Sequence, residues 1–161
     1  PSHLAGELFN TMSGVNLTHV PYKGSGAALS DLVGGQVHVS FGGLAAAAQL
    51  VKAGKLRLVA VTTAKRVAAL PDVPTVAEAA LPGFNYDGWY GLIAPARTPP
   101  AVINVLSRTV GDILRSTEIA EKLAAQGAAA KPTTPAEFDR MVREEIVIRS
   151  KVLKATGARA Q

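Results

Sequence analysis

Between residues 15 and 62 the chain alternates short apolar runs with segments of helical periodicity, and glycines separate most of them. The apolar runs predict strands, and the segments between them predict helices. The expected elements are strand Val15–Tyr22, helix Ser25–Val33, strand Gln36–Phe41, helix Leu44–Ala53 and strand Leu56–Thr62. Because a helix between two strands is typical of a parallel crossover, this order predicts an α/β fold with a parallel-rich sheet.

The segments on either side of this alternation are of a different kind. A helix is expected at Ser2–Ser13, ahead of the first strand. Leu70–Phe84 contains three prolines and predicts an irregular connector, with one short helix opened by a capping box of Thr75 and Glu78. Tyr86–Ala94 holds the only tryptophan and predicts another strand.

Beyond Pro95 the pattern changes to amphipathic helices. These are expected from an N-cap at Thr98 to about Arg115, over Thr117–Ala125, and from a Thr134/Glu137 capping box to about Thr156, with an edge strand at Ala128–Thr133. Six apolar residues of the first helix are expected to face inward: Val102, Val105, Leu106, Val110, Ile113 and Leu114.

No continuing sheet accompanies these helices, so Tyr86–Ala94 is expected to cross into a second lobe whose other strands lie outside this sequence. The expected division is 1–86 as one ligand-binding lobe with its start truncated, 87–95 as a crossover or hinge strand, and 96–161 as the C-terminal helical part of the other lobe. The first residue is Pro1 rather than Met, which also predicts a processed or truncated piece. The lack of a visible signal peptide therefore says nothing about location.

Composition and charge distribution argue against a nucleic-acid-binding protein. The chain has 161 residues, is 48% apolar and only 5% aromatic, so a core mostly of Ala, Val and Leu is expected. The net charge is +5; residues 1–96 carry six Lys/Arg against five Asp/Glu, and residues 97–161 carry eleven against seven. The excess lies along expected solvated helices with few aromatics between the charges, whereas a nucleic-acid surface has a clustered basic stripe. Nucleic acid is not an expected partner.

The turn V-P-Y-K-G-S-G, Val20–Gly26, is the strongest candidate binding site. It joins an expected strand to an expected helix, so free backbone N–H groups and the positive end of the helix dipole surround one point and favour a carboxylate. Ser25 is a suitable N-cap, and Gly24 and Gly26 allow a ligand to approach the backbone. The alternative is an ordinary strand-to-helix turn with a serine cap. The turn at Phe41–Leu44 lies at the same carboxyl edge of the expected sheet, which favours the anion site.

Catalytic motifs are weak. The absence of cysteine removes thiolate nucleophiles and cysteine metal sites, and His3, His19 and His38 lie on separate elements without metal-ligand spacing. Surface or core imidazoles are therefore favoured over a metal site, and no cofactor is expected. The only remaining enzyme hypothesis has Ser25 as a nucleophile, and the sequence does not identify a general base for it. Lys23 either pairs with an acidic ligand or is simply solvated.

Seven strings of the sequence resemble those of one known family. They are His3–Phe9 (HLAGELF), Val20–Ser25 (VPYKGS), Gly34–Val37 (GGQV), Lys52–Arg57 (KAGKLR), Ala60–Arg66 (AVTTAKR), Leu70–Ala79 (LPDVPTVAEA) and Ala94–Pro100 (APARTPP). In this order they resemble the Bug family, the TctC-type substrate-binding proteins of tripartite tricarboxylate transporters. The resemblance implies a periplasmic, two-lobed binding protein of the type II-like class, which closes over a small carboxylate and delivers it to membrane transporter subunits. It also implies an N-terminal lobe ahead of Pro1.

In that family, ligand carboxylates are held by backbone N–H groups, hydroxyls and helix N-termini from both lobes. Carried over to this sequence, the resemblance implies the following ligand-binding residues: Ser2, His3, Tyr22, Lys23, Gly24, Ser25, Gly26, Phe41, Gly42, Gly43 and Trp89. Trp89 and its neighbour Tyr90 form either a ligand-facing wall or hinge, or part of the core between the lobes.

Two departures from the family pattern bear on ligand and packing. Many relatives have F-D-N-L where this chain has Phe41–Leu44, so an acidic side chain near the site is missing. This argues against an amino-acid ligand and leaves a di- or tricarboxylate or an aromatic acid. Relatives also often carry Trp where Arg149 stands, so packing of the last helix is expected to differ.

Two other functions stay open from the sequence. One is an interaction or scaffold domain without transport, which would expose apolar surface on helices 99–115 and 135–156 and self-associate. The other is a small serine-dependent hydrolase using Ser25. Under the transport hypothesis, the chain alone is expected to bind carboxylates at most weakly.

Overall fold

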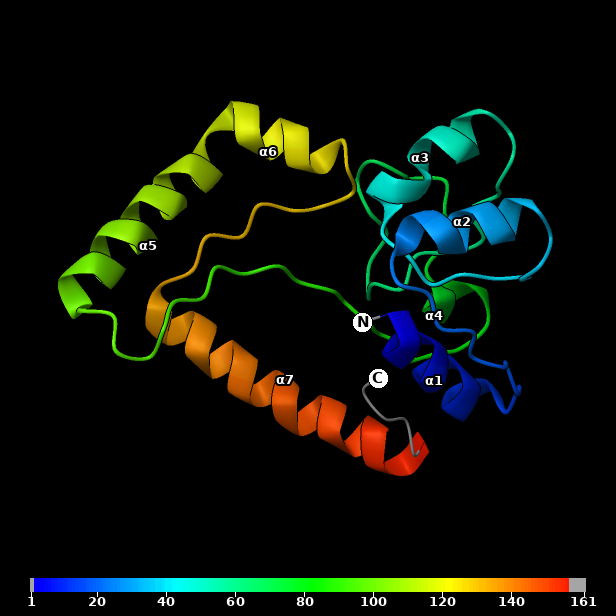
Figure 1. The fold of residues 1–161 in the computed structure, drawn as a ribbon. Coiled ribbons are helices and arrows are strands. Elements are labelled where there is room, and N and C mark those ends of the chain that lie inside the picture. Colours follow the sequence, from blue (N-terminus) through cyan, green and yellow to red (C-terminus); the bar gives the residue numbers. More distant parts are fainter. Residues whose placement is uncertain (1, 157–161) are drawn as a thin grey trace. The chain divides into compact units, whose positions relative to one another are not determined.

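The computed structural model describes residues 2–156, apart from the side chains of residues 151, 152 and 154–156. Figure 1 shows its helices, which are α1 (Ser2–Ser13), α2 (Ser25–Val33), α3 (Leu44–Lys52), α4 (Val76–Ala79), α5 (Pro100–Arg115), α6 (Thr117–Ala124) and α7 (Pro135–Thr156). The chain divides into a first unit, Pro1–Gly88 with the chain end from Val152, and a second unit, Trp89–Lys151. Among the described residues, no helix combines the length and the apolar composition that a membrane crossing requires.

The helices begin and end within a residue or two of where local signals predict them. After α2 the backbone N–H of Gly34 donates to the Ser30 carbonyl at 2.9 Å, and Gly35 follows with φ of 74°. That positive φ is easy only for glycine, so the G-G pair ends the helix cleanly. The helix predictions are confirmed.

Both predicted capping boxes are present. The Glu78 N–H donates to Thr75 Oγ1 at 3.0 Å and the Thr75 N–H donates to Glu78 Oε2 at 2.9 Å. At the start of α7 the Glu137 N–H donates to Thr134 Oγ1 at 3.2 Å, and the Thr134 N–H donates to Glu137 Oε2 at 2.8 Å. In each box the backbone hydrogen bond is the main reason that the carboxyl pKa lies below its usual value. Four otherwise unpaired helix-end donors are satisfied in this way.

Two other cap predictions are wrong. Ser25 is the first residue of α2, and Gly24, with φ of 149°, is its N-cap. Only glycine adopts that φ readily, so the chain turns one residue earlier than a serine cap would require. Thr98 does not cap α5 either, because Pro99 is extended at ψ of 140° and takes the N-cap position, with Pro100 as the first helical residue.

The expected strands do not pair into a sheet within residues 2–156. No ladder involves the ranges Val15–Tyr22, Gln36–Phe41, Tyr86–Ala94 or Ala128–Thr133. Leu56–Thr62 contributes one parallel bridge, between Val61 and Thr75. In that bridge the Val61 N–H donates to the Pro74 carbonyl and the Val76 N–H donates to the Val61 carbonyl, both at 2.9 Å. A strand takes its hydrogen bonds from a neighbour, so an alternating pattern specifies extended backbone but does not supply the partner.

The first unit packs on a small core with aromatic rings at its centre. Phe84 is 1% exposed, and Ala5 and Val76 are also buried. The Phe9 ring lies 5.7 Å from the Phe41 ring and 6.3 Å from the Phe84 ring, measured between centroids. The expected core of Ala, Val and Leu is therefore incomplete, because three of the few aromatic residues gather here. Large rings bury more area per residue than these aliphatic side chains.

In the second unit, Trp89 and α7 are held together by an edge-to-face contact between Trp89 and Phe138, with centroids 5.3 Å apart. Gly91 lies under the same phenyl ring, where an added Cβ would be 2.1 Å from Phe138 Cζ. The expectation that the apolar face of α5 points inward is wrong for four of its six residues, since Val102, Val105, Leu106 and Ile113 are all exposed. Among the described residues of this unit, none covers these four side chains fully.

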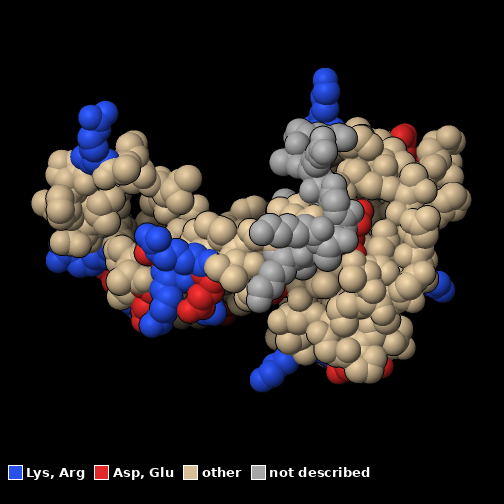
Figure 2. Space-filling model, turned by 90° about the horizontal axis from the view of Figure 1, so that it is seen from below, with Lys and Arg blue, Asp and Glu red and all other residues tan. Residues whose placement is uncertain are grey.

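Charged side chains on the helices pair with one another. Lys122 contacts Glu118 at 2.6 Å, Arg143 contacts Asp139 at 2.7 Å, and Arg149 pairs with Glu145, all at i, i+4 spacing. Figure 2 shows basic and acidic side chains interspersed over part of the visible face instead of one basic stripe. The two exposed pairs contribute only a few tenths of a kcal/mol each, about 0.2–0.5. Arg149, which stands where relatives often carry Trp, takes part in a part-buried ion pair.

Candidate functional site

The turn Tyr22–Gly26 is fixed against the helix that follows it. The Tyr22 hydroxyl donates to Asp31 Oδ2 at 2.7 Å, and Asp31 lies on α2. This hydrogen bond to a carboxylate is the main reason that the pKa of Tyr22 is raised. Because the phenol and the acid satisfy each other, the turn has a defined conformation before any ligand arrives. Lys23, Gly24, Ser25 and Gly26 are all exposed, so this backbone is accessible.

Helices α2 and α3 both begin with a glycine cap. Gly24 caps α2 and Gly43 caps α3, and neither helix start has a side-chain cap hydrogen bond. The first backbone N–H groups of a helix have no partner one turn earlier, and glycine offers no side-chain oxygen to accept them. In α3 the Ala46 N–H donates to the Gly43 carbonyl at 3.3 Å. The remaining N–H groups at the two helix starts are open to an anion, which the helix dipole also favours.

Helix α1 brings the two turns into one neighbourhood. The His3 ring in its first turn stacks on His19, three residues before Tyr22, with centroids 3.7 Å apart and planes 5° apart. Gly6 faces the other turn, since a Cβ added there would lie 3.6 Å from Phe41 Cδ2. In Figure 1, α1, α2 and α3 all begin along the same side of the first unit.

The predicted site residues are thus brought together only in part. Ser2, His3, the turn Tyr22–Gly26 and the turn Phe41–Gly43 are grouped around the first half of α1. The Phe41 side chain packs on Phe9, so what this position leaves to a ligand is mainly the backbone of the two glycines that follow. Trp89 belongs to the second unit, where it is 41% exposed and contacts Phe138. Its neighbour Tyr90 is fully exposed.

His19 is a residue of this neighbourhood that the sequence pattern did not single out. Its pKa is lowered, first by partial burial and then by the positive charge of His3, while Glu7 acts in the opposite direction. The His3 Nε2 lies 3.4 Å from Glu7 Oε1. A contact between residues 3 and 19 depends on the fold of the intervening chain, so the spacing of histidines along the sequence carried no signal for it.

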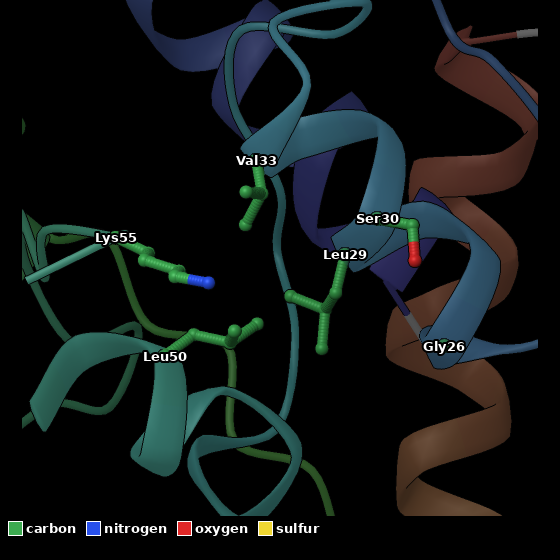
Figure 3. A pocket seen from close by; sticks show the side chains of 6 residues that line it. All are labelled: Gly26, Leu29, Ser30, Val33, Leu50 and Lys55. Atoms are coloured by element: carbon green, nitrogen blue, oxygen red, sulfur yellow. The ribbon is translucent and has the colours of Figure 1, made fainter. Parts of the chain in front are cut away.

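A hollow of about 410 Å³ opens between α2 and α3 (Figure 3). Its lining consists of Gly26, Leu29, Ser30, Val33, Leu50 and Lys55. Leu29 and Val33 of α2 face Leu50 of α3, with the Lys55 amine at one side. Only Gly26 is shared with the predicted ligand-binding residues, so this aliphatic hollow is separate from most of the helix starts described above.

Within residues 2–156, histidine and carboxylate side chains form no group of three or more suited to holding a metal ion. The chemistry that the described site offers is hydrogen-bond donation to a small anion, from backbone N–H groups and from neighbouring hydroxyl and imidazole groups.

Comparison with known proteins shows which family this chain resembles in sequence and fold. Residues 1–158 match the model of the tripartite tricarboxylate transporter family receptor, TctC. Protein BugT of Bordetella pertussis is 35% identical over 158 residues, which are 98% of this chain and 48% of BugT. The chain spans about half the length of this curated relative.

Two solved structures are close in fold. The structure of Rhodopseudomonas palustris Rpa4515 with adipate has a TM-score of 0.92 at 42% identity, over 97% of this chain and 52% of that one. MatC from the same organism, with bound malate, has a TM-score of 0.84 at 32% identity, over 94% of this chain and 53% of MatC. These likenesses confirm the predicted class, a periplasmic-binding-protein-like α/β lobe, although within residues 2–156 the Val61–Thr75 bridge is the only pairing of the expected strands. From the ordered strings, the match over residues 1–158 and the two structural likenesses, the chain belongs to the TctC family of tripartite tricarboxylate transporter receptors.

Proposed function

We propose that this chain is part of an extracytoplasmic solute-binding protein and supplies one side of a site for a small carboxylate, taken up by a tripartite tricarboxylate-type transporter. The observation that carries the proposal is the grouping of three helix starts, two of them glycine-capped and without side-chain caps, around His3 and the Tyr22–Gly26 turn. Adipate and malate, which appear in the names of two structural neighbours, are dicarboxylates and fit this chemistry.

In the proposed site, the ligand carboxylate accepts hydrogen bonds from N–H groups at the start of α2, around Ser25 and Gly26. The Gly42–Gly43 backbone at the start of α3 and Ser2 at the start of α1 complete the donors from this unit. Tyr22, held by Asp31, fixes the turn, and Lys23 adds a positive charge on an exposed side chain. Trp89 is the proposed contribution of the crossover segment. Helix-end N–H groups stabilise anions most strongly when the ligand lies within the first turn.

The proposed division of the chain follows from the same family membership. Residues 1–86 form one lobe, 87–95 the crossover, and 96–161 helices of the other lobe. The boundary between the two compact units, at Gly88 and Trp89, supports this division. The exposed apolar residues of α5 also support it, because a lobe-forming helix needs a partner surface.

Family membership also supports three further parts of the proposal. The protein acts as a receptor without catalysis, it works in the periplasm, and its macromolecular partners are the membrane subunits of the transporter. Nucleic acid is not a proposed partner, and the pairing of basic with acidic side chains on α6 and α7 supports its exclusion.

Thermal shift of the full-length gene product with a panel of acids tests the proposal. Adipate, malate, a longer dicarboxylate and benzoate are each compared with the neutral diamide of adipic acid. A ligand at a hundredfold excess over its Kd stabilises the folded protein by about 2.7 kcal/mol, which is readily measured. Stabilisation by one of the acids and none by the diamide is expected. If no carboxylate stabilises the protein, the proposed function is wrong.

A second candidate function is favoured by one observation. Val102, Val105 and Ile113 on α5, and Ile146–Ile148 on α7, are exposed, as an interaction or scaffold domain would require. Sedimentation of the full-length product decides between the two functions. A carboxylate-binding monomer supports the receptor, whereas an oligomer that binds no acid supports the scaffold. A hydrolase using Ser25 is tested by Ser25→Ala, since unchanged ester hydrolysis would remove that alternative.

A further inference from the structure

A stacked pair of imidazoles joins the start of α1 to the segment that leads into the Tyr22–Gly26 turn. The centroids of the His3 and His19 rings are 3.7 Å apart, and the ring planes differ by 5°. Within residues 2–156 the ring nitrogens of His19 have no hydrogen-bond partner. The His19 side chain therefore has a donor and an acceptor to offer, three residues before the Tyr22–Gly26 turn.

The negative charge next to the His3–His19 pair offsets one protonated imidazole but not two. Two protons on rings at this separation bring two positive charges together, and like charges so close repel. Glu7, whose Oε1 lies 3.4 Å from His3 Nε2, supplies one negative charge. His3 and Glu7 are the charged groups that act on His19, and both lie on α1. The side chains of His3 and Glu7 are 31% and 19% exposed, whereas His19 is exposed, so water screens the repulsion between the rings in part. A second anion next to His19 would favour a second proton on the pair.

We propose that His19 is a further ligand-binding residue, and that a bound carboxylate provides this second anion, so that carboxylate binding is coupled to proton uptake by the His3–His19 pair. The inference rests on the proposed function, because the anion is the carboxylate assigned to the helix starts. The proton comes from solvent and adds to an imidazole nitrogen, which then donates to the carboxylate. By linkage, the anion raises the proton affinity of the pair and the proton raises the affinity for the anion by the same factor.

The lowered pKa of His19 is consistent with this coupling. Although His19 is exposed, the slight desolvation of its ring and the neighbouring His3 both disfavour the protonated form in the unliganded protein. A neutral ring is required if ligand binding is to add a proton. A ring already protonated in the free protein would bind the anion without any uptake.

Isothermal titration calorimetry of the full-length gene product with adipate measures the coupling directly. Titrations at pH 6.5 in buffers of different ionisation enthalpy report the number of protons taken up per ligand bound. A fractional uptake between zero and one proton is expected. The Kd should tighten as pH falls from 7.5 to 6.5, a range in which adipate stays a dianion, by at most about tenfold per pH unit where a whole proton is taken up. Binding with no proton uptake and no change in Kd across this range overturns the inference.

Three variants separate the proton from the stacking contact. His19→Phe keeps a planar ring on His3 but cannot be protonated, and His19→Gln removes both the ring and the charge. In both variants the proton uptake should disappear, with weakened adipate binding at pH 6.5, where adipate stays a dianion. His38→Gln is the matched control, because His38 lies outside the pair, and its proton uptake should equal that of the wild type. Undiminished uptake in His19→Phe would show that the proton is bound elsewhere.

The outcomes also distinguish failure of the proton coupling from failure of the proposed carboxylate binding. If adipate and the other acids bind at no pH, the proposed function fails. If they bind with a pH-independent Kd, the function stands and the coupling alone is wrong. If the His19 variants do not fold, the proton count of the wild type and an NMR titration of its histidine ring protons, with and without adipate, still decide the question.

Discussion

The two units of this chain differ in what their apolar side chains contact. In the first unit Phe84 is 1% exposed, and the Phe9 ring packs against both Phe84 and Phe41. In the second unit α5 is more regularly amphipathic, but Val102 is 46% exposed and Val105 is 53% exposed. Apolar periodicity is present in both units, whereas burial is found mainly in the first. The pattern tells which face of a helix is apolar, but a partner surface decides whether that face is buried.

The largest expected effect is at the aromatic core. Phe84→Ala should lower the free energy of unfolding by about 3–5 kcal/mol, because it removes a fully buried ring and leaves a cavity. Val102→Ala in the second unit should change it by about 0.5 kcal/mol or less, as at other exposed positions. Urea denaturation of this 161-residue chain measures both. A cost for Val102→Ala similar to that of Phe84→Ala would contradict the contrast between the units.

The same Val102→Ala variant in the full-length gene product sharpens the comparison. If the rest of the lobe to which α5 is proposed to belong covers this helix, the cost should rise to about 1–2 kcal/mol, close to the transfer free energy of the two methyl groups removed. An unchanged small cost in the full-length protein would show that this face stays exposed there.

The Gly91 position tests packing inside the second unit. Gly91→Ala should destabilise this unit by about 1–3 kcal/mol, because the new Cβ would lie 2.1 Å from Phe138 Cζ. Gly88→Ala is the matched control, since nothing lies within 4 Å of a Cβ there. Combining Gly91→Ala with Phe138→Leu should recover part of the loss. Tryptophan fluorescence is a suitable probe because Trp89 contacts Phe138. Equal losses in the two glycine variants would disprove the close contact.

The two capping boxes should behave alike although they lie in different units. Thr75→Ala and Thr134→Ala each remove a side-chain oxygen that accepts the N–H of a glutamate, which typically costs about 1 kcal/mol. Thr75 is 1% exposed and loses packing in addition, so its cost should be the larger of the two. Thermal unfolding followed by circular dichroism measures both, and a larger cost at Thr134 would contradict this order.

The smallest expected effect is the pH dependence of these boxes. Glu78 and Glu137 have lowered pKa values in the folded protein, mainly because each carboxylate accepts a backbone N–H. A lowered folded pKa means that the stabilisation is complete above the ordinary glutamate pKa of 4.5 and is lost as pH falls through the folded pKa. Unfolding midpoints between pH 6 and pH 3 should therefore fall less steeply in Glu78→Gln than in the wild type. If the unfolding midpoints of Glu78→Gln and the wild type fell equally steeply with pH, the expected contribution of the Glu78 carboxylate would be contradicted.

The parts of the fold that were predictable are those with nearby causes. The bounds of α2 and the Thr75/Glu78 box depend on hydrogen bonds that span three or four residues. Even here, one glycine changed the outcome, because Gly24 adopts φ of 149° and takes the cap position expected of Ser25. For the site, the turns at Tyr22–Gly26 and Phe41–Gly43 were identified from sequence, but the stack of His19 on His3 was not.

By itself, then, the sequence determined where helices begin and end, which faces are apolar and to which family the chain belongs. Tertiary structure alone decided that Val61 pairs with Thr75, that Phe84 is buried while Val102 is not, and that His3 meets His19. The physical reason is distance along the chain. Helical hydrogen bonds and caps close within about four residues, whereas sheet pairing, burial and ring stacking require a surface that distant residues provide.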